Sequence, residues 1–400
     1  MSANSLVNDD SNGARICGML LHAYYIRDPR VQRAAQALRD DGWTVKVVCL
    51  NEGGEADEEV VDGIQVIRCR MSRSGKRTRF RFVIEYLEFM LRSAFKLLRE
   101  EIRERHDLIL VHNMPNALVF STLLLRLRGC PVVLDMHDAA PEVFVSHFGV
   151  KSKLFLKLVL LEEKLAIKFA SALITVNHGI EAVLRKRHPH DGFLIVHNSP
   201  SAQHMMARDQ SSVIGSDGFR MVFHGHLHER SGIQRVVRVI PALVRLGIDI
   251  RFDVHGDGPY REPLLEMLDR LEVSDRVTLH GRFTPEELSE ILGGKHLGIA
   301  PHFKDDLGDL MLPVKILEYT QVGLPVLCSR LVTVESYFSE DSMYFFDSDE
   351  DLQQAIVAIH HDYAVALECA ARARRVSDTI SWEVDSAKLV DFVSALCNTR

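Results

Sequence analysis

Short apolar runs alternate with longer amphipathic segments along the whole chain of 400 residues. The apolar runs have the length of strands buried on both faces, and the segments between them repeat apolar residues at helical spacing. In the first half, strands are predicted at 15–21, 44–50, 64–69, 107–112, 131–135, 172–176 and 193–197. Helices are predicted between them at 29–41, 80–105, 115–128, 151–169 and 178–187.

A second series of strands and helices begins near residue 219. Its strands are predicted at 220–224, 250–254, 276–280, 297–300 and 325–328. Its helices are predicted at 232–247, 259–271, 284–292, 313–322, 349–360 and 362–376, and a last helix follows at 381–397. Regular alternation of this kind predicts parallel sheets with right-handed crossovers, so the fold class is α/β with two doubly wound, Rossmann-like domains.

The domain boundaries follow from the polar stretches of the chain. We expect a disordered lead-in over 1–14, an N-terminal domain over 15–205, a C-terminal domain over 206–379 and a C-terminal helix over 380–400 that packs back on the first domain. Ligands of open α/β sheets bind at the carboxyl ends of the strands. We therefore expect the two sheets to face a central cleft that holds the substrates.

Composition narrows the class of protein. A net charge of −7 argues against general nucleic-acid binding, and no segment is apolar enough for a membrane span. The seven cysteines are scattered, without a CxxC pair, and several lie in strand-like runs. Buried, reduced thiols in a cytoplasmic protein are the simplest interpretation.

The segment 312–326 carries the most informative chemistry. Pro313 suits the first position of a helix and Gly323 suits its end. Lys315 lies in the first turn, where the helix dipole disfavours a cation unless an anion such as a phosphate binds there. Glu318, one turn further, could accept hydrogen bonds from the hydroxyls of a ribose. The alternative is an exposed Lys315–Glu318 ion pair without a ligand.

Other candidates follow the strands of the second half. Arg230 precedes a predicted helix start, where Ser231 and Gln234 suggest a capping box, and it could bind a phosphate through its planar fork. The glycine loops 256–258 and 281–283 would let the backbone approach a base or ribose. A solvated arginine and plain tight turns are the alternatives.

In the first half, His137 follows strand 131–135 and could bind a sugar hydroxyl or stabilise a developing charge. Asp28 and Arg30 open helix 29–41, where Arg30 could help to neutralise the phosphates. A structural histidine and an arginine that covers the helix end are the alternatives.

The motifs that carry a family resemblance are spread from about residue 15 to 330, in the order DPRVQRAAQALRDDGWTVKVV, LILVHNMP, PVVLDMHDAAPE, SALITVNHGI, LIVHNSP, GHLHERSG, HGDGP, HGRF and LPVKILEYTQVGLPVL. Together they resemble the family-4 retaining glycosyltransferases of the GT-B fold. The resemblance implies a nucleoside-diphosphate sugar as donor and no cofactor.

By this resemblance, Glu318 matches the ribose-binding glutamate, Arg230 and Lys315 the diphosphate-binding pair, and His137 the substrate histidine of the first domain. The loop at Gly281 and Arg282 matches the region that receives the base. There are departures: Leu310 stands where many members carry a second glutamate, with Asp309 beside it as a possible substitute. His226 stands where many relatives have arginine.

The expected reaction is transfer of a hexose-type sugar to an acceptor with retention at the anomeric carbon. Because Leu310 cannot act as a nucleophile, we expect attack from the face that the diphosphate leaves, with a phosphate oxygen taking the acceptor proton. Arg230 and Lys315 would stabilise the charge on the diphosphate, so no metal is expected. The His-x-His pairs at 226/228 and 188/190 are interpreted as loop histidines. A sugar-nucleotide 2-epimerase of the same fold and a non-catalytic nucleotide-sugar-binding scaffold remain alternatives.

The acceptor is suggested by a basic segment. Seven basic residues and no acidic one lie between Arg68 and Arg81, and the aromatic residues Phe80, Phe82, Tyr86 and Phe89 overlap and follow them. Basic charge beside aromatic anchors is typical of peripheral docking on anionic lipid. We therefore predict that residues 68–89 contact the inner face of the plasma membrane, and that the acceptor is a lipid-linked or cell-surface polysaccharide intermediate. A solvated loop with an ordinary core-facing helix is the alternative.

Overall fold

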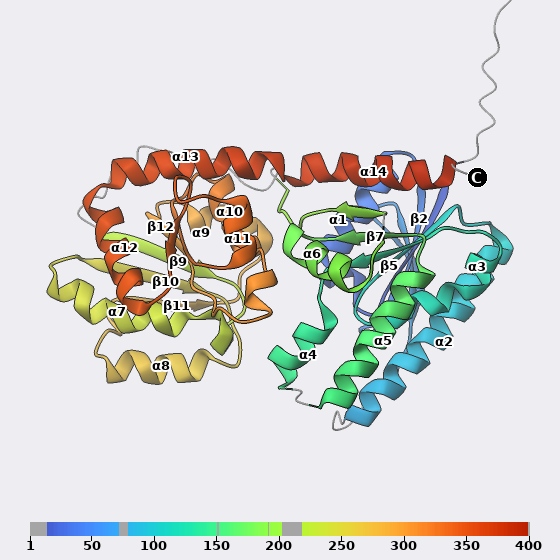
Figure 1. Ribbon diagram of the computed structural model, residues 1–400, viewed down its shortest axis with the longest axis horizontal. Coiled ribbons are helices and arrows are strands. Elements are labelled where there is room, and N and C mark those ends of the chain that lie inside the picture. Colours follow the sequence, from blue (N-terminus) through green and yellow to red (C-terminus); the bar gives the residue numbers. More distant parts are fainter. Residues whose placement is uncertain (1–13, 72–78, 150–151, 191, 202–217, 399–400) are drawn as a thin grey trace, which may run out of the picture. The chain divides into compact units, whose positions relative to one another are not determined.

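A computed structural model of the chain describes residues 14–71, 79–149, 152–190, 192–201 and 218–398. The chain forms two compact units (Figure 1). The N-terminal unit draws on Met1–Thr175, Arg187–Leu194 and Ser386–Arg400, and the C-terminal unit on Val176–Lys186 and Ile195–Asp385. Each unit is built on one sheet, which confirms the predicted fold class.

The N-terminal unit contains an eight-stranded sheet in the described part of the chain, in the order β3-β4-β2-β1-β5-β6-β7-β8. Its strands are β1 Ile16–Leu21, β2 Thr44–Leu50, β3 Glu58–Val61, β4 Ile64–Cys69, β5 Leu108–His112, β6 Val132–Met136, β7 Ala172–Thr175 and β8 Phe193–Ile195. β1 pairs in parallel with both β2 and β5, so the strand order reverses between β1 and β5. β3, which the sequence did not predict, is an antiparallel edge strand on β4.

The helices of this unit largely follow the prediction. They are α1 Pro29–Asp40, α2 Arg79–Arg103, α3 Leu123–Leu127, α4 Ala140–Phe148 and α5 Lys153–Phe169. The predicted helix 115–128 is instead a 3₁₀ helix, Asn116–Thr122, followed by the short α3. The physical reason is that hydroxyl side chains bond the local backbone, as the Thr122 hydroxyl does to the Val119 carbonyl at 2.6 Å. α4 was not predicted.

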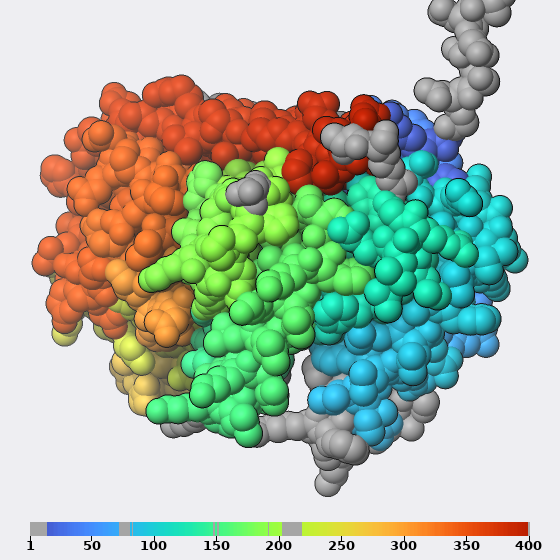
Figure 2. Space-filling model, turned by 45° about the vertical axis from the view of Figure 1, so that its right-hand side comes forward, coloured from blue at the N-terminus to red at the C-terminus, as the bar shows by residue number. Residues whose placement is uncertain are grey.

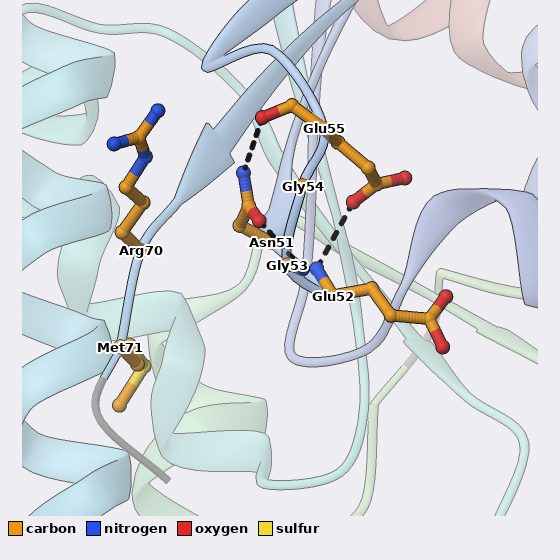
Figure 3. Close-up of a pocket in the computed structure, with 7 residues that line it drawn as sticks. All are labelled: Asn51, Glu52, Gly53, Gly54, Glu55, Arg70 and Met71. Atoms are coloured by element: carbon orange, nitrogen blue, oxygen red, sulfur yellow. Dashed lines mark hydrogen bonds between the residues drawn. The ribbon is translucent and has the colours of Figure 1, made fainter.

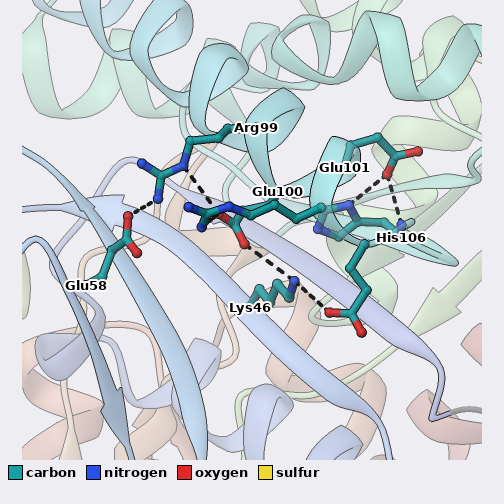
Figure 4. A network of polar contacts seen from close by, with 8 residues as sticks. Lys46, Glu58, Arg99, Glu100, Glu101 and His106 are labelled. Atoms are coloured by element: carbon teal, nitrogen blue, oxygen red, sulfur yellow. Dashed lines mark hydrogen bonds and ion pairs between the residues drawn. The ribbon is translucent and has the colours of Figure 1, made fainter.

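A buried ion-pair network fastens the C-terminal part of α2 to the sheet (Figure 4). The Lys46 ammonium on β2 lies 3.4 Å from the Glu100 carboxylate and 3.0 Å from that of Glu104. The Glu101 carboxylate lies 2.9 Å from Nδ1 of His106. Glu100 and Glu101 of this helix are therefore turned inward, away from solvent.

The C-terminal unit contains a six-stranded sheet in its described part, in the order β11-β10-β9-β12-β13-β14. Its strands are β9 Phe219–His224, β10 Ile250–His255, β11 Val277–Gly281, β12 Leu297–Ala300, β13 Val326–Ser329 and β14 Tyr344–Phe346. All five pairings are parallel. The strand order reverses between β9 and β12, and ligands of such sheets bind at this kind of switch point.

Helices cover both faces of this sheet and enclose two apolar cores. From α6 onward the described helices are α6 His178–Arg187, α7 Ile233–Arg245, α8 Arg261–Arg270, α9 Leu288–Leu292, α10 Val314–Gln321, α11 Val332–Tyr337, α12 Asp349–His361, α13 Tyr363–Thr379 and α14 Trp382–Asn398. Those from α7 to α13 pack in the two cores. α7, α8 and α12 share one core with Phe219 and Phe252 of the sheet. α9, α10, α11 and α13 share the other around Tyr319, whose ring lies against Gly298, where a Cβ would come within 2.5 Å of it. α11 and β14 were not predicted.

The start of α7 differs from the prediction. Ser231 and Gln234 do not form a capping box, because the Ser231 hydroxyl donates to the His226 carbonyl and the Gln234 amide to the Glu229 carbonyl. Glu229–Ser231 form a 3₁₀ helix instead, and Gly232 with φ +72° begins α7. By contrast, Pro313 and Gly323 delimit α10 as predicted.

The last helix, α14, is shared between the units. Its first residues belong to the C-terminal unit, and its remainder belongs to the N-terminal unit, where the Asn398 amide oxygen accepts a hydrogen bond from Arg15 at 2.8 Å. Among the described helices, none is both long enough and apolar enough to cross a bilayer. The seven cysteines form no disulfide, and all but Cys397 are buried.

Candidate functional site

The candidate site of the C-terminal unit lies at the switch point between β9 and β12, where three loops stack backbone against backbone. A Cβ on Gly256 would lie 1.9 Å from the Gly225 carbonyl oxygen, and one on Gly258 would lie 2.4 Å from that of Leu227. Across the loop, a Cβ on Gly232 would lie 1.7 Å from the Pro301 carbonyl oxygen. Only glycine allows these approaches, so the loop after β9 is held rigidly over the strand ends.

Lys315, from the first turn of α10, lies directly beneath this loop. Its ammonium is 3.3 Å from Nε2 of His302 and 4.1 Å from the ring centroid of Phe223. A Cβ on Gly225 would be 3.5 Å from it. Burial lowers the pKa of Lys315 from 10.5 to about 7, although the Glu318 carboxylate opposes that shift. The site thus holds a buried amine that an anion would favour in its charged form.

Arg230 lies close to the same loop. Its guanidinium bonds the Asp305 carboxylate at 2.7 Å, and its carbonyl accepts from the Phe303 amide at 3.1 Å. The pKa of His302 falls well below its usual value because of burial, and both Lys315 and Arg230 add to the effect. Lys315 and Arg230, the two predicted phosphate ligands, therefore both lie near enough to His302 to lower its pKa.

Glu318 is half-buried beside the end of β9. One carboxylate oxygen lies 3.3 Å from Nε2 of His224. Burial lowers the pKa of His224 well below its usual value, and Lys315 adds to the shift, so the imidazole is neutral at pH 7. Glu318 and Lys315 share one helix end, as their spacing predicted.

Aromatic and imidazole rings form the adjoining wall of the site. The Phe283 ring meets those of His224 and His255 edge to face, at 5.7 and 6.3 Å between centroids. His255 and His280 stack at 4.1 Å. Flat surfaces of this kind suit a nucleobase.

The base-region candidates Gly281 and Arg282 lie at the end of β11. Gly281 has φ +98°, and a Cβ placed on it would have no neighbouring atom within 4 Å, so its surroundings are open. The exposed Arg282 guanidinium bonds the Asp257 carboxylate at 3.1 Å. Both residues therefore adjoin the aromatic wall rather than the buried amine.

Asp309 and Leu310 form a 3₁₀ turn before α10. The Asp309 carboxylate accepts from the Val332 amide at 3.1 Å, at the start of α11. The Leu310 carbonyl accepts from the Asn177 side chain at 3.0 Å. Asp309 thus has a capping role besides the sugar-binding role that the sequence suggested.

In the N-terminal unit, Arg30 forms a buried, two-pronged ion pair with Asp135, at 2.9 Å from Nε and 2.8 Å from Nη2. Its guanidinium is therefore directed at a carboxylate on β6. Burial alone would raise the pKa of Asp135, but Arg30 and two neighbouring histidines hold it well below its usual value. Asp28 caps α1 by accepting from the Val31 amide at 3.1 Å.

His137 lies next to this ion pair. Its Nδ1 is 3.9 Å from the Asp135 carboxylate, and Nδ1 of His112 is 2.9 Å from the same oxygen. Burial disfavours the charged imidazole, but Asp135 outweighs it and raises the pKa of His137. Asn113 fixes the loop by accepting from the His137 amide at 3.1 Å. The backbone of His137 is thus fixed, and its imidazole lies beside the Asp135 carboxylate with Nδ1 beyond hydrogen-bonding distance.

His112, Asp135 and His137 lie close enough to share a metal ion. However, Arg30 already bonds both oxygens of Asp135, and a divalent cation beside that guanidinium would be repelled. The cluster is better described as an ion-paired support for His137. The predicted independence from metal stays a prediction.

A separate hollow of about 420 Å³ lies at the carboxyl ends of β2 and β4 (Figure 3). The loop 51–55 forms one wall, and Arg70 and Met71 form the other. The Asn51 and Glu55 side chains bond that loop internally. The hollow contains none of the predicted site residues.

Several residues of these sites were not predicted from the sequence, among them Asp135 and the four histidines His112, His224, His255 and His302. We consider the four histidines here. The first three end buried strands, and His302 follows one closely. A polar side chain at the carboxyl end of a parallel strand was the available signal, because ligands bind at that edge.

Comparisons with known proteins agree with this architecture. Residues 28–198 match the family described as Glycosyl transferase 4-like domain, and residues 218–362 match Glycosyl transferases group 1. A sucrose-phosphate synthase from Thermosynechococcus elongatus has the same fold, with a TM-score of 0.79 at 15% identity over 96% of this chain and all of that one. Anabaena HepE, solved in complex with UDP, also has this fold. Its TM-score is 0.70 at 12% identity, over 96% of this chain and all of that one.

Among curated proteins, a subunit of the phosphatidylinositol N-acetylglucosaminyltransferase of Arabidopsis thaliana is 25% identical over 178 residues. The match covers 44% of this chain and 38% of that protein, so the chain aligns with less than half of that relative's length.

Proposed function

The chain belongs to the family-4 glycosyltransferases of the GT-B fold, and on that premise we propose that it moves a hexose-type sugar from a nucleoside diphosphate to an acceptor hydroxyl with retention. The observation that carries the proposal is the half-buried ammonium of Lys315 at the switch point of the C-terminal sheet, beneath Gly225 and 3.3 Å from His302. The polar side chain in contact with it is a histidine, so a diphosphate in the site would supply the counter-charge.

In this proposal Lys315 and Arg230 hold the diphosphate and Glu318 holds the ribose. Arg230 would exchange Asp305 for a phosphate oxygen. Phe283 and the stacked His255 and His280 support a base-binding role for the neighbouring wall.

In the reaction, the bond between the anomeric carbon and the diphosphate oxygen breaks, and the acceptor oxygen bonds that carbon from the same face. The acceptor proton moves to the departing diphosphate. Lys315 and Arg230 stabilise the negative charge that develops there, which is commonly the largest catalytic contribution. His137, oriented by Asp135 and Asn113, binds a substrate hydroxyl.

The acceptor we propose is a lipid-linked or cell-surface polysaccharide intermediate at the inner face of the plasma membrane. The name of the Arabidopsis relative specifies a phosphatidylinositol acceptor, which supports a lipid-borne acceptor here. The UDP bound to HepE makes UDP-sugars the first donors to test.

The test is NMR of the protein with UDP-glucose, UDP-N-acetylglucosamine and GDP-mannose. A retaining transferase without acceptor hydrolyses its donor slowly, and the sugar first released has the donor's anomeric configuration. Inversion at C2 would identify an epimerase, and binding without conversion a scaffold, and either result would overturn the proposal. Release of the opposite anomer would overturn retention alone.

A further inference from the structure

We propose that the outward face of α2, α3 and α5 docks the protein on an anionic lipid surface. We call this face the docking face and define it by the side chains Val83, Ile84, Leu87, Leu91, Phe95, Ile102, Leu123, Leu124, Leu127, Leu154, Phe155, Leu158, Leu161 and Leu165. The proposal rests on the proposed function only in bringing a lipid-borne acceptor within reach.

Exposed apolar side chains are concentrated on these three helices. Of the 23 large hydrophobic residues that are exposed in the described part of the chain, the 14 of the docking face lie there. Leu91, Phe95 and Ile102 are 70–74% exposed, and Leu154 is 71% exposed. Monomeric soluble proteins rarely display so many apolar side chains on one face unless it binds something.

On the two long helices several acidic side chains are buried while large apolar side chains are exposed. On α2, Glu85, Glu100 and Glu101 are buried, and the last two belong to the network that holds the helix on the sheet (Figure 4). The apolar stripe at Leu87, Leu91 and Phe95 repeats every four residues on the outward side. The helix therefore has a second apolar stripe besides the buried one at Phe89 and Leu97, which an ordinary surface helix lacks.

α5 shows the same arrangement. Glu163 is fully buried and lies 3.0 Å from His188. Glu162 bonds the Asn116 amide at 3.0 Å and the backbone of the 3₁₀ helix behind it. Both carboxylates of α5 therefore point into the protein.

All the lysines of α5 face outward. Lys153, Lys157, Lys164 and Lys168 are exposed. At 3.6 residues per turn they form a row along one edge of the stripe made by Leu154, Leu158, Leu161 and Leu165. A leucine stripe edged by lysines is typical of helices that lie in the interface of an anionic bilayer.

The three helices form one continuous surface. Both α2 and α5 pack on the 3₁₀ helix Asn116–Thr122, which leads directly into α3. In Figure 2 the teal surface of this segment borders both the green surface of α5 and the blue surface of α2, and the two helices part from each other beyond it. α3 adds three exposed leucines and the exposed Arg128, and it contains no acidic residue.

Charge decides between a lipid surface and a second copy of the chain. A symmetric dimer through this face would bring the lysine row of α5 against itself or against α2, whose half-exposed Glu88 is already paired with Arg92 at 2.8 Å. α3 and α5 expose no carboxylate that could pair with these lysines, whereas anionic head groups would neutralise them.

The docking face overlaps the predicted segment 68–89 only at Val83, Ile84 and Leu87. The other residues that carried that prediction do not belong to it. Arg68 is buried in ion pairs with Glu55 and Glu59, and Phe89 is fully buried. Tyr86 packs against the His22 ring. Residues 72–78 lie outside the described part, and of Arg79, Phe80 and Phe82 only the backbone is described.

The test is co-sedimentation of the full chain with phosphatidylcholine vesicles, with and without phosphatidylglycerol, at low and high salt. We expect binding to the anionic vesicles that weakens with salt. Lys157→Glu with Lys164→Glu should lower the partition coefficient at least tenfold, and Leu154→Gln with Leu158→Gln should also weaken it. The matched controls, Arg245→Glu with Arg270→Glu and Leu246→Gln with Leu265→Gln, change exposed residues of the C-terminal unit and should bind as the unchanged chain does.

Equal binding to neutral and anionic vesicles, or unchanged binding of the docking-face variants, would overturn the proposal. So would a concentration-dependent dimer in light scattering that the leucine variants abolish, because the face would then be a protein interface. Binding of UDP-glucose, measured on the same variants, should be unchanged. Vesicle binding without any donor binding would contradict the transferase function and leave the docking face standing.

Discussion

At the scale of single residues, Lys315 shows how burial and charge compete. Burial lowers its pKa to about 7 in a protein without ligand, while an unfolded lysine titrates near 10.5. A bound phosphate would favour the charged amine and raise that pKa again. Donor binding and proton binding are therefore coupled at this residue.

The first prediction concerns pH. Affinity for UDP-glucose should fall as pH rises above about 7, because the free protein then loses the ammonium proton that the diphosphate requires. Calorimetry in buffers of different ionisation enthalpy should detect proton uptake on binding near pH 8. Lys315→Met should bind more weakly and without this proton uptake.

The contribution of Lys315 to folding stability should rise with pH, whereas the affinity for the donor should fall. Between pH 7 and about 10.5 the unfolded chain binds more protons at Lys315 than the folded chain does, so this residue makes the free energy of unfolding rise with pH. If affinity for the donor were flat from pH 6 to 9, the assignment of Lys315 to the phosphate would be wrong.

The second prediction concerns Glu318. Glu318→Ala should remove a charged hydrogen bond to ribose worth about 1.5–3 kcal/mol, which lowers kcat/KM by roughly 10–150-fold. Donor hydrolysis measured by NMR provides the rate. Glu335→Ala, which removes an exposed ion pair with Arg330 in the same unit, is the control and should leave the rate unchanged. An unaffected Glu318 variant with intact fold would contradict the ribose role.

Pairs of site residues could be predicted from the sequence only where the two residues are close together along the chain. Lys315 and Glu318 share one helix, so their spacing alone was enough to place them together. Arg30 and Asp135 are 105 residues apart, and nothing local links them. The remaining clue was a carboxylate within the apolar run of strand 131–135, since a buried charge needs a partner.

At the scale of elements, the loops over the C-terminal sheet depend on glycine contacts rather than on side chains. Gly256 has φ +140° and touches the Gly225 backbone, whereas Gly247 has φ +82° with no atom near a Cβ. A substitution at Gly247 therefore tests backbone strain alone, whereas one at Gly256 tests strain together with steric contact.

The third prediction uses this pair. Gly247→Ala should cost about 1–2 kcal/mol of unfolding free energy through its left-handed backbone alone. Gly256→Ala should cost more and also weaken UDP binding, because its methyl group would displace the loop that covers Lys315. Thermal melts and calorimetry measure the two effects. Equal losses in both variants would show that the stacked loops are not rigid.

Element boundaries were predictable where one local rule dominates. Asp28 and Pro29 fix the start of α1, and Gly323 fixes the end of α10. The start of α7 was not predictable in this way. The side chains of Ser231 and Gln234 donate to nearby backbone carbonyls instead of forming a capping box. β3 and β14 were missed because short edge strands carry little periodic pattern.

At the scale of the whole molecule, the chain passes between the two units several times. The segment Val176–Lys186 follows β7 of the N-terminal sheet but belongs to the C-terminal unit. Asn177 anchors it: its side-chain oxygen accepts from the Ile180 amide at 2.9 Å, and its amide bonds the Leu310 carbonyl at 3.0 Å. The sequence showed the alternation of elements but not this exchange, which depends on contacts between distant segments.

The fourth prediction tests that anchor. Asn177→Ala should lose a helix cap and leave the half-buried Leu310 carbonyl without this partner, at a cost of about 1–3 kcal/mol. Ser152→Ala removes an exposed cap of α5 and should cost about 1 kcal/mol or less. Denaturant unfolding of both variants measures the difference. Similar values would show that the Leu310 bond contributes little.

The distribution of chain segments between the units also constrains how related enzymes can be recombined. Transplanting a donor-binding unit from a relative at a single junction near residue 205 would leave α6 and the start of α14 with the wrong host. The chain changes units after Thr175, Lys186, Leu194 and Asp385. A hybrid that respects those four crossings keeps each segment with the unit to which it belongs, and hybrids joined only once should be less stable.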